Sequence, residues 1–192
     1  MSNKPVLYPC DLVFFRSRSL LSRLICFFTR QPWESSTKTS HVAMVVDRGE
    51  LWDALIVEAV WKRVRKIALG RGYLNKQDEI CIFRPLNIDV VTKAVICVKA
   101  QDYIGKRYSL FQLFLHFLDW CLFGIYVFRR LGGLENRVIC SFIPTGCYEV
   151  GGLDFGVENY EAQPDDEWDY CVKHLGEYYQ FVWQRGSMYF GR

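Results

Sequence analysis

The stretch TSHVAMVV, residues Thr39–Val46, decides how the rest of the chain is interpreted. It is nearly all apolar and rich in valine, which predicts a short buried strand, and the following Asp47–Gly49 supplies a turn. One of the chain's three histidines, His41, stands at the mouth of this strand. Such a ring is either a packed side chain bonded to the backbone or a catalytic base that faces a cleft. The strand alone leaves both interpretations open.

The composition indicates one globular domain that spans residues 1–192. A chain of 192 residues that is 51% hydrophobic and 16% aromatic is large enough to bury a core. Its net charge of +3 is too small to indicate nucleic-acid binding, so we expect no nucleic-acid partner. The N-terminal segment 1–5 is polar and no long apolar stretch follows it directly. We therefore expect no cleaved secretory signal and a cytoplasmic location.

Charged residues are unevenly distributed along the chain. Six Lys and Arg residues crowd the segment 62–76, whereas the segment 138–172 holds eight acidic residues and no Lys or Arg. We interpret both segments as solvated faces, and the alternative is that the basic segment meets the acidic one.

The eight cysteines do not indicate a metal site. No two of them have the C-x-x-C spacing, and no two histidines lie three to five residues apart. Several, among them Cys81 and Cys97, lie inside apolar runs and are expected to be buried free thiols in a reducing compartment. We therefore expect neither a metal ion nor another cofactor.

Hydrophobic periodicity and turn residues predict an α+β fold, with a small, mostly antiparallel sheet or partial barrel packed against helices. Asn87 is the predicted cap of one helix, and Pro164 begins another with acidic residues in its first turn. The predicted elements are strands at residues 11–15, 39–46, 54–61, 80–84 and 178–183, and helices at 17–30, at 88–103, from Ser141 and from Pro164.

One carboxylate interrupts the apolar strand predicted at residues 54–61. Glu58 lies between Val57 and Ala59, whose side chains point to the opposite face of a strand. A carboxylate buried without a partner costs several kcal/mol. Glu58 is therefore expected either to face solvent or to have a partner.

The run 110–128 is almost wholly apolar and close to the length needed to cross a bilayer. Gln112, His116 and Asp119 form one polar stripe along it, which argues against a simple membrane span. A buried or cleft-covering helix fits this pattern best, and peripheral membrane contact through residues 110–128 is the alternative.

Cys140 best meets the requirements for a nucleophile. Ser141 can begin a helix, and a helix N-terminus or an adjacent imidazolium lowers the pKa of a thiol. His41 is then a candidate base and Glu58 a candidate partner that orients its ring. Spacing alone leaves the other cysteines open as inert or reactive groups.

Six short motifs, taken in their order along the chain, together resemble a known protein family. They are Asp11–Phe15, Ser40–Val46, Val57–Ala59, Ile82–Arg84, Gly105–Tyr108 and Cys140–Ser141. Together they resemble the circularly permuted NlpC-type branch of the papain-like cysteine hydrolases, the YiiX-like group. The resemblance implies a permuted papain-like fold with Cys140 as nucleophile, His41 as general base and Glu58 as orienting carboxylate. It places Tyr108 near the site, where its hydroxyl holds an oxyanion or a substrate carbonyl, or where the ring is only packed.

The expected function is that of a thiol hydrolase that cleaves an amide or ester through an acyl-enzyme. Its expected substrate is a peptide or peptidoglycan fragment, or a lipid ester whose acyl chain is held by residues 110–128. Pro144 departs from the resemblance, because it is expected to shorten or delay the helix after Cys140. The alternative is therefore a catalytically weak or inactive binding module on the same fold.

Overall fold

The central feature of the fold is an open, mostly antiparallel sheet. The computed structural model describes residues 4–17, 22–23, 26, 37–109, 115, 118, 137–159 and 162–188. The sheet order is β10 (Tyr179–Arg185), β7 (Glu79–Pro85), β2 (Leu12–Arg16), β3 (His41–Asp47), β5 (Leu55–Val60), β6 (Arg63–Ala68), β8 (Arg107–Tyr108) and β9 (Arg137–Val138). Neighbouring strands run antiparallel except β8 and β9, which are parallel. The described strands do not close into a barrel.

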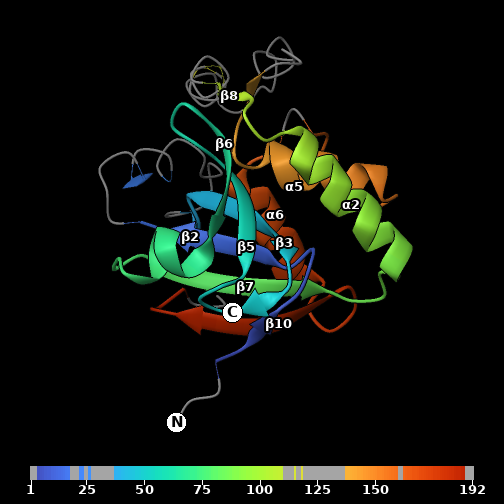
Figure 1. Ribbon diagram of the computed structural model, residues 1–192, viewed down its shortest axis with the longest axis horizontal. Coiled ribbons are helices and arrows are strands. Elements are labelled where there is room, and N and C mark those ends of the chain that lie inside the picture. The colour runs from blue at the N-terminus through green and yellow to red at the C-terminus, as the bar shows by residue number, and fades with distance from the viewer. Residues whose placement is uncertain are drawn as a thin grey trace.

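Alternation of side chains along the strands divides the core between the two faces of this sheet. One face carries Phe14, Met44 and Phe83 and packs against the helices. The helices are α2 (Val90–Asp102), α5 (Phe142–Val150) and α6 (Pro164–Lys173), which Figure 1 shows gathered beside and behind the sheet.

The other face of the sheet carries Phe15, Val45 and Ile56. The two-stranded sheet of β1 (Val6–Leu7) and β4 (Gly49–Glu50) and the π-helical turn η1 (Gly70–Leu74) pack against this face. They contribute Leu7 and Tyr73 to this second cluster. His41 and Glu58 follow the same alternation as Val45 and Ile56, so the pleat places them on this face.

Most predicted elements agree with the structure, and the α+β class with a mostly antiparallel sheet is confirmed. The helix predicted from Ser141 is α5, and Ser141 is its N-cap residue. Helix α6 begins at Pro164 and has acidic residues in its first turn, as predicted. Its N-terminus is a capping box, in which the backbone N–H of Gln163 donates to Asp166 over 2.9 Å.

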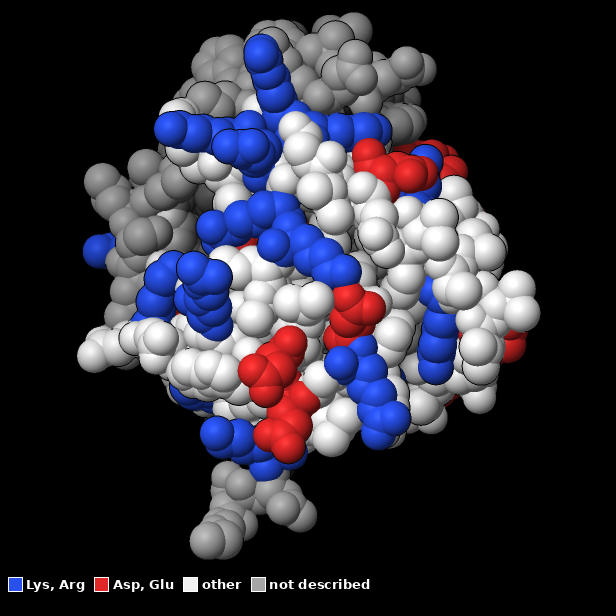
Figure 2. Space-filling model, in the orientation of Figure 1, with Lys and Arg blue, Asp and Glu red and all other residues white. Residues whose placement is uncertain are grey.

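The predicted cap of α2 was wrong. Asn87 does not cap α2; it adopts a left-handed φ of 58°, and the Asp89 carboxylate instead accepts from the backbone N–H groups of Val91 and Thr92. The interpretation of the basic segment as a solvated face agrees with the structure, since Lys62, Arg63, Lys66, Arg71 and Lys76 are exposed. The segment also contains β6 and η1, which were not predicted. Its long basic side chains hid the alternation that buries Val64. Lys and Arg side chains nevertheless gather around β6 and β8, at the top of the face in Figure 2.

Two predicted helices fall mainly outside the described residues. Ser22, Arg23 and Cys26 are helical, as are Leu115 and Leu118, and the rest of the predicted helices 17–30 and 110–128 lies outside the description. In the part of the chain that is described, no helix has the length and apolar character to cross a membrane.

Candidate functional site

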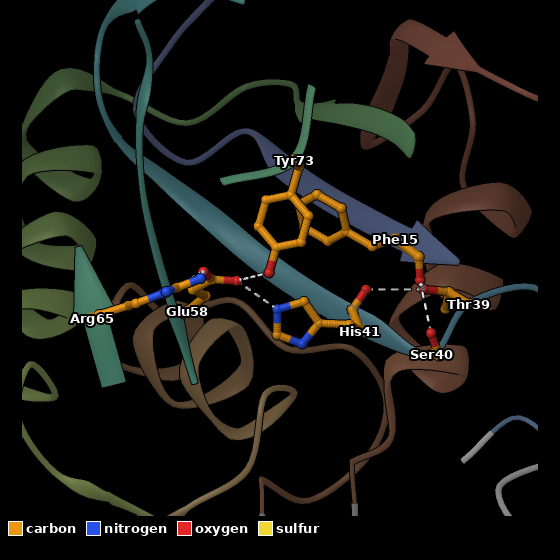
Figure 3. Close-up of polar contacts among 7 residues, drawn as sticks. All are labelled: Phe15, Thr39, Ser40, His41, Glu58, Arg65 and Tyr73. Atoms are coloured by element: carbon orange, nitrogen blue, oxygen red, sulfur yellow. Dashed lines mark hydrogen bonds and ion pairs between the residues drawn. The ribbon is translucent and has the colours of Figure 1, made fainter. Parts of the chain in front are cut away.

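His41 is fixed at the start of β3 by its neighbours on β2. In the β2–β3 register it lies opposite Phe15, and the two rings are 5.4 Å apart between centroids. The preceding residues tie the strand down, because the backbone N–H of Ser40 donates to the Phe15 carbonyl over 2.9 Å and Thr39 Oγ1 lies 3.0 Å from the carbonyls of both Phe15 and His41 (Figure 3). The His41 side chain is 18% exposed, so the ring is held but still accessible.

Glu58 is fully buried and is the centre of a polar cluster (Figure 3). Its Oε2 lies 2.8 Å from Nε2 of His41 and also accepts from the hydroxyl of Tyr73. Its Oε1 accepts from Nε of Arg65 over 2.9 Å and lies 2.8 Å from Nη2 of the same guanidinium. Of the two expectations for Glu58, solvent exposure was wrong, and a buried carboxylate with partners is what the structure has.

These partners keep Glu58 ionised. Burial alone raises the pKa of Glu58, but the hydrogen bond and charge of His41, the Tyr73 hydroxyl and the charge of Arg65 outweigh burial and lower the pKa below its usual value. A buried carboxylate with charge-assisted hydrogen bonds on both oxygens is a rigid anchor for the imidazole.

Arg65 and Tyr73 are the functional residues that the sequence analysis missed. Arg65 lies directly opposite Glu58 in a hairpin whose last pair is Val60 and Arg63. If a two-residue turn is assumed after Val60, the sequence alone places Arg65 opposite Glu58. Tyr73 reaches the site from η1 and stacks on Phe15 with 4.0 Å between ring centroids, and no sequence pattern indicated that contact.

Cys140 lies directly before the N-cap of α5 and is 6% exposed. The Cys140 side chain lies close enough to His41 to act on the pKa of its ring. Since Nε2 of His41 engages Glu58, Nδ1 is the ring nitrogen available to the thiol. Burial lowers the pKa of His41, but the hydrogen bonds and charges of Cys140 and Glu58 outweigh it and raise the pKa to about 10. The structure therefore brings together the three residues that the sequence analysis selected.

The helix after Cys140 is not shortened by Pro144, contrary to expectation. Helix α5 runs from Phe142 to Val150, and Pro144 falls in its first turn, where a backbone N–H has no intrahelical acceptor in any case. Ser141 makes no side-chain cap, since its hydroxyl donates to the carbonyl of Ala162 over 2.7 Å. The positive end of the α5 dipole therefore faces the Cys140 region without a side-chain acceptor from the N-cap.

Tyr108 is the fourth residue that the sequence analysis selected, and it lies close to Cys140. It is half-buried on β8, where it pairs with Val138, two residues before Cys140. Burial and the charge of Cys140 raise the pKa of Tyr108, which keeps its hydroxyl protonated and able to donate.

A second buried carboxyl lies near the thiol and was not selected from the sequence. Glu167 on α6 is fully buried, and neither of its oxygens makes a hydrogen bond of normal geometry to the described residues. Burial, followed by the charges of Cys140 and Asp166, raises the pKa of Glu167 well above its usual value, and the backbone N–H of Thr145 offsets this only in part. No sequence pattern indicated a buried carboxyl here, because an acidic residue in the first turn of a helix is ordinarily explained by the helix dipole.

Comparisons with known proteins bear on the fold. No family model matches the sequence, and no curated protein matches it. Among solved structures, the chain is similar to the metalloprotein YiiX, DUF1105, from Escherichia coli O157:H7, with a TM-score of 0.54 and 20% identity. The match covers 80% of this chain and 71% of that one. This shows a YiiX-like fold. Within the described residues of this chain, no three His, Cys, Asp or Glu side chains are grouped so that they could hold a metal ion.

Proposed function

We propose that this protein is a thiol hydrolase of the permuted papain-like kind, which cleaves an amide or ester through an acyl-enzyme. The observation that carries the proposal is the position of His41 between two groups. One ring nitrogen is 2.8 Å from the buried Glu58 carboxylate, and the Cys140 side chain lies close enough to raise the pKa of the ring. A nucleophile, a base and a group that orients the base are the parts that such catalysis requires.

In the acylation step, the Cys140 thiolate attacks the substrate carbonyl carbon and forms the C–S bond. The imidazolium of His41 then gives its proton to the leaving amine or alkoxide as the scissile bond breaks. In the deacylation step, neutral His41 takes a proton from water, which attacks the thioester and releases the acid product and the thiolate. Glu58 stabilises the imidazolium and fixes its ring angle throughout.

Two kinds of donor are available to the oxyanion of the tetrahedral intermediate. The Tyr108 hydroxyl lies near Cys140, and the first turn of α5 directs backbone N–H groups toward the same region. Loss of a single oxyanion donor slows acyl transfer by about 10²–10³-fold in other enzymes. We assign Tyr108 this role because its hydroxyl stays protonated beside the nucleophile.

The substrate is proposed as a class. A peptide or peptidoglycan amide and a lipid ester both present the carbonyl that the thiolate attacks, and they differ in what surrounds that carbonyl. Kinetic assays with a peptide p-nitroanilide panel and a p-nitrophenyl ester panel of increasing acyl length would rank the two classes.

The test of the function is turnover by the full chain and by single variants. We expect Cys140→Ala to abolish turnover and His41→Ala to lower kcat/KM by about 10²–10⁴-fold. Cys81→Ala is the matched control, since Cys81 is a fully buried thiol on β7. A wild-type chain that turns over no member of either panel would leave a binding module on this fold as the better account. A Cys140→Ala variant with unchanged turnover would show that Cys140 is not the nucleophile.

A further inference from the structure

Two adjoining cavities form a trough along the loop that follows α5. The first has a volume of about 530 Å³ and reaches from Thr145 to Asp166. The second has a volume of about 370 Å³ and extends to Pro85 and Tyr178. Leu153 and Asp154 line both cavities, so the two cavities adjoin at these residues, and we call them together the trough.

The charge of the trough has one sign. Its carboxylates are Glu149, Asp154, Glu158 and Asp166. No Lys or Arg lines either cavity among the described residues. This contrasts with the basic surface around β6 and β8 (Figure 2).

Three tyrosines line the second cavity: Tyr170, Tyr178 and Tyr179. The rings of Tyr170 and Tyr179 meet edge to face, with centroids 6.1 Å apart and planes at 87°. The ring of His174 contacts two of these tyrosines, with ring centroids 4.4 Å from Tyr170 and 5.1 Å from Tyr178. Pro85, Leu86 and Ile88 add apolar walls.

Asp154 supplies a carboxylate at the junction of the two cavities. Its Oδ1 accepts from the backbone N–H of Gly156 over 2.9 Å, which fixes the side chain and leaves Oδ2 for a ligand. Asp154 is exposed, so a ligand in the trough reaches it directly.

We propose that the trough binds a small organic cation, with an alkylammonium group on the tyrosine rings and Asp154 as its counter-charge. The face of a tyrosine ring attracts a cation, and the apolar walls contact the methyl or methylene groups next to the charge. A neutral ligand would form no ion pair with Asp154, and an anion would be repelled by it. The proposal is independent of the proposed hydrolase activity, since no catalytic residue lines either cavity.

The test is an NMR titration of the full chain with choline and with 3,3-dimethyl-1-butanol, the neutral carbon isostere of choline. We expect choline to shift the ring signals of Tyr170, Tyr178 and Tyr179 and to bind about 10-fold or more tightly than the isostere. N-acetyl-lysine methylamide in a parallel titration distinguishes a primary ammonium on a peptide from a quaternary group. Equal affinity for choline and its isostere, or no shift of the tyrosine signals with either cation, would overturn the proposal.

Matched variants locate the contacts. Asp154→Asn keeps the oxygen that accepts from Gly156 but removes the charge, so choline binding should weaken by about 3-fold or more. Tyr178 is 47% exposed, so its substitution is compatible with folding. Tyr178→Phe should retain binding because the ring face remains, whereas Tyr178→Leu should weaken it by about 3-fold. Unchanged affinity in both Asp154→Asn and Tyr178→Leu would contradict the assignment.

Discussion

Glu58 and Arg65 face each other across the β5–β6 hairpin, and the guanidinium holds Oε1 of the carboxylate through Nε at 2.9 Å and Nη2 at 2.8 Å. The carboxylate is fully buried, whereas the Arg65 side chain is 42% exposed. The pair therefore connects solvent to the buried side of the candidate catalytic site, and Arg65 supports the charge on which His41 depends.

Replacement of Arg65 should destabilise the chain through Glu58. In Arg65→Gln, the Glu58 carboxylate loses one charged partner but keeps His41 and Tyr73, so we expect a loss of about 1–2 kcal/mol in the free energy of unfolding. Urea denaturation measures this loss in the free energy of unfolding. Arg63→Gln is the control, because Arg63 is exposed on the same strand. Equal losses in the two variants would contradict a specific role for Arg65.

The stability that His41 contributes should depend on pH in a defined window. The pKa of His41 is about 10 in the folded chain against 6.5 for the free side chain. A raised pKa gives stability that is fully present below about pH 6.5 and is lost as the pH rises toward 10. The difference in unfolding free energy between wild type and His41→Gln should therefore shrink over this window. A difference that stays constant from pH 6.5 to 10 would count against the ion pairs of His41.

The stability that Glu58 contributes should be lost at low pH, whereas that of His41 is lost at high pH. Its pKa is lowered in the folded chain, so its contribution is present above about pH 4.5 and is lost as the pH falls further. The His41 ring signals of Glu58→Gln should titrate at a lower pH than those of wild type, because a carboxylate that raises the pKa of the ring has become neutral. Titration by NMR measures this directly, and an unchanged His41 pKa would show that Glu58 does not act on the ring.

Glu167 should lower the stability of the folded chain as the pH rises, which is the reverse of the effect of Glu58. Its pKa is raised by burial, so the folded chain holds a proton that the unfolded chain releases, and stability falls as the pH rises above about 4.5. Glu167→Gln mimics the protonated carboxyl and should gain stability relative to wild type between pH 4.5 and pH 7. Chemical denaturation at the two pH values measures the gain, and a Gln variant that loses stability over that window would show an ionised, partnered carboxylate.

Gly146 should tolerate no larger side chain. A Cβ there would lie 2.6 Å from Oη of Tyr103 and 2.7 Å from Nδ2 of Asn159, so Gly146→Ala should cost about 1–3 kcal/mol by overpacking. Gly72→Ala is the control, since its nearest contact would be an ordinary 3.7 Å. Thermal unfolding compares the two, and equal melting temperatures would contradict the close packing around α5.

Much of the fold followed from short apolar stretches whose period matched a strand. The strands that hold His41 and Glu58 were predicted because valine and isoleucine there favour the extended backbone of a β-strand. The strand β6 was not predicted, because Arg65 and Lys66 satisfy their charges across the sheet with Glu58 and Asp47, and such pairs are invisible before the register is known.

Three residues of the candidate site were predictable from the sequence, but the residues that surround them were not. Cys140, His41 and Glu58 were selected by chemistry and by resemblance, and the structure brings them together. Tyr73 and Glu167 come from elements whose packing on the site depends on the whole chain. No local pattern carries that information, so the surroundings of the triad required the structure.

The most direct test of the central claim is the rate at which iodoacetamide alkylates each cysteine, resolved by mass spectrometry. Cys140 and Cys26 are exposed to nearly the same extent, 6% and 8%, but of these two thiols Cys140 is the one that acts on the pKa of His41. The account predicts that Cys140 reacts at least about 10-fold faster than Cys26 and that His41→Ala removes the difference. Equal rates at Cys140 and Cys26 in the wild-type chain would contradict it.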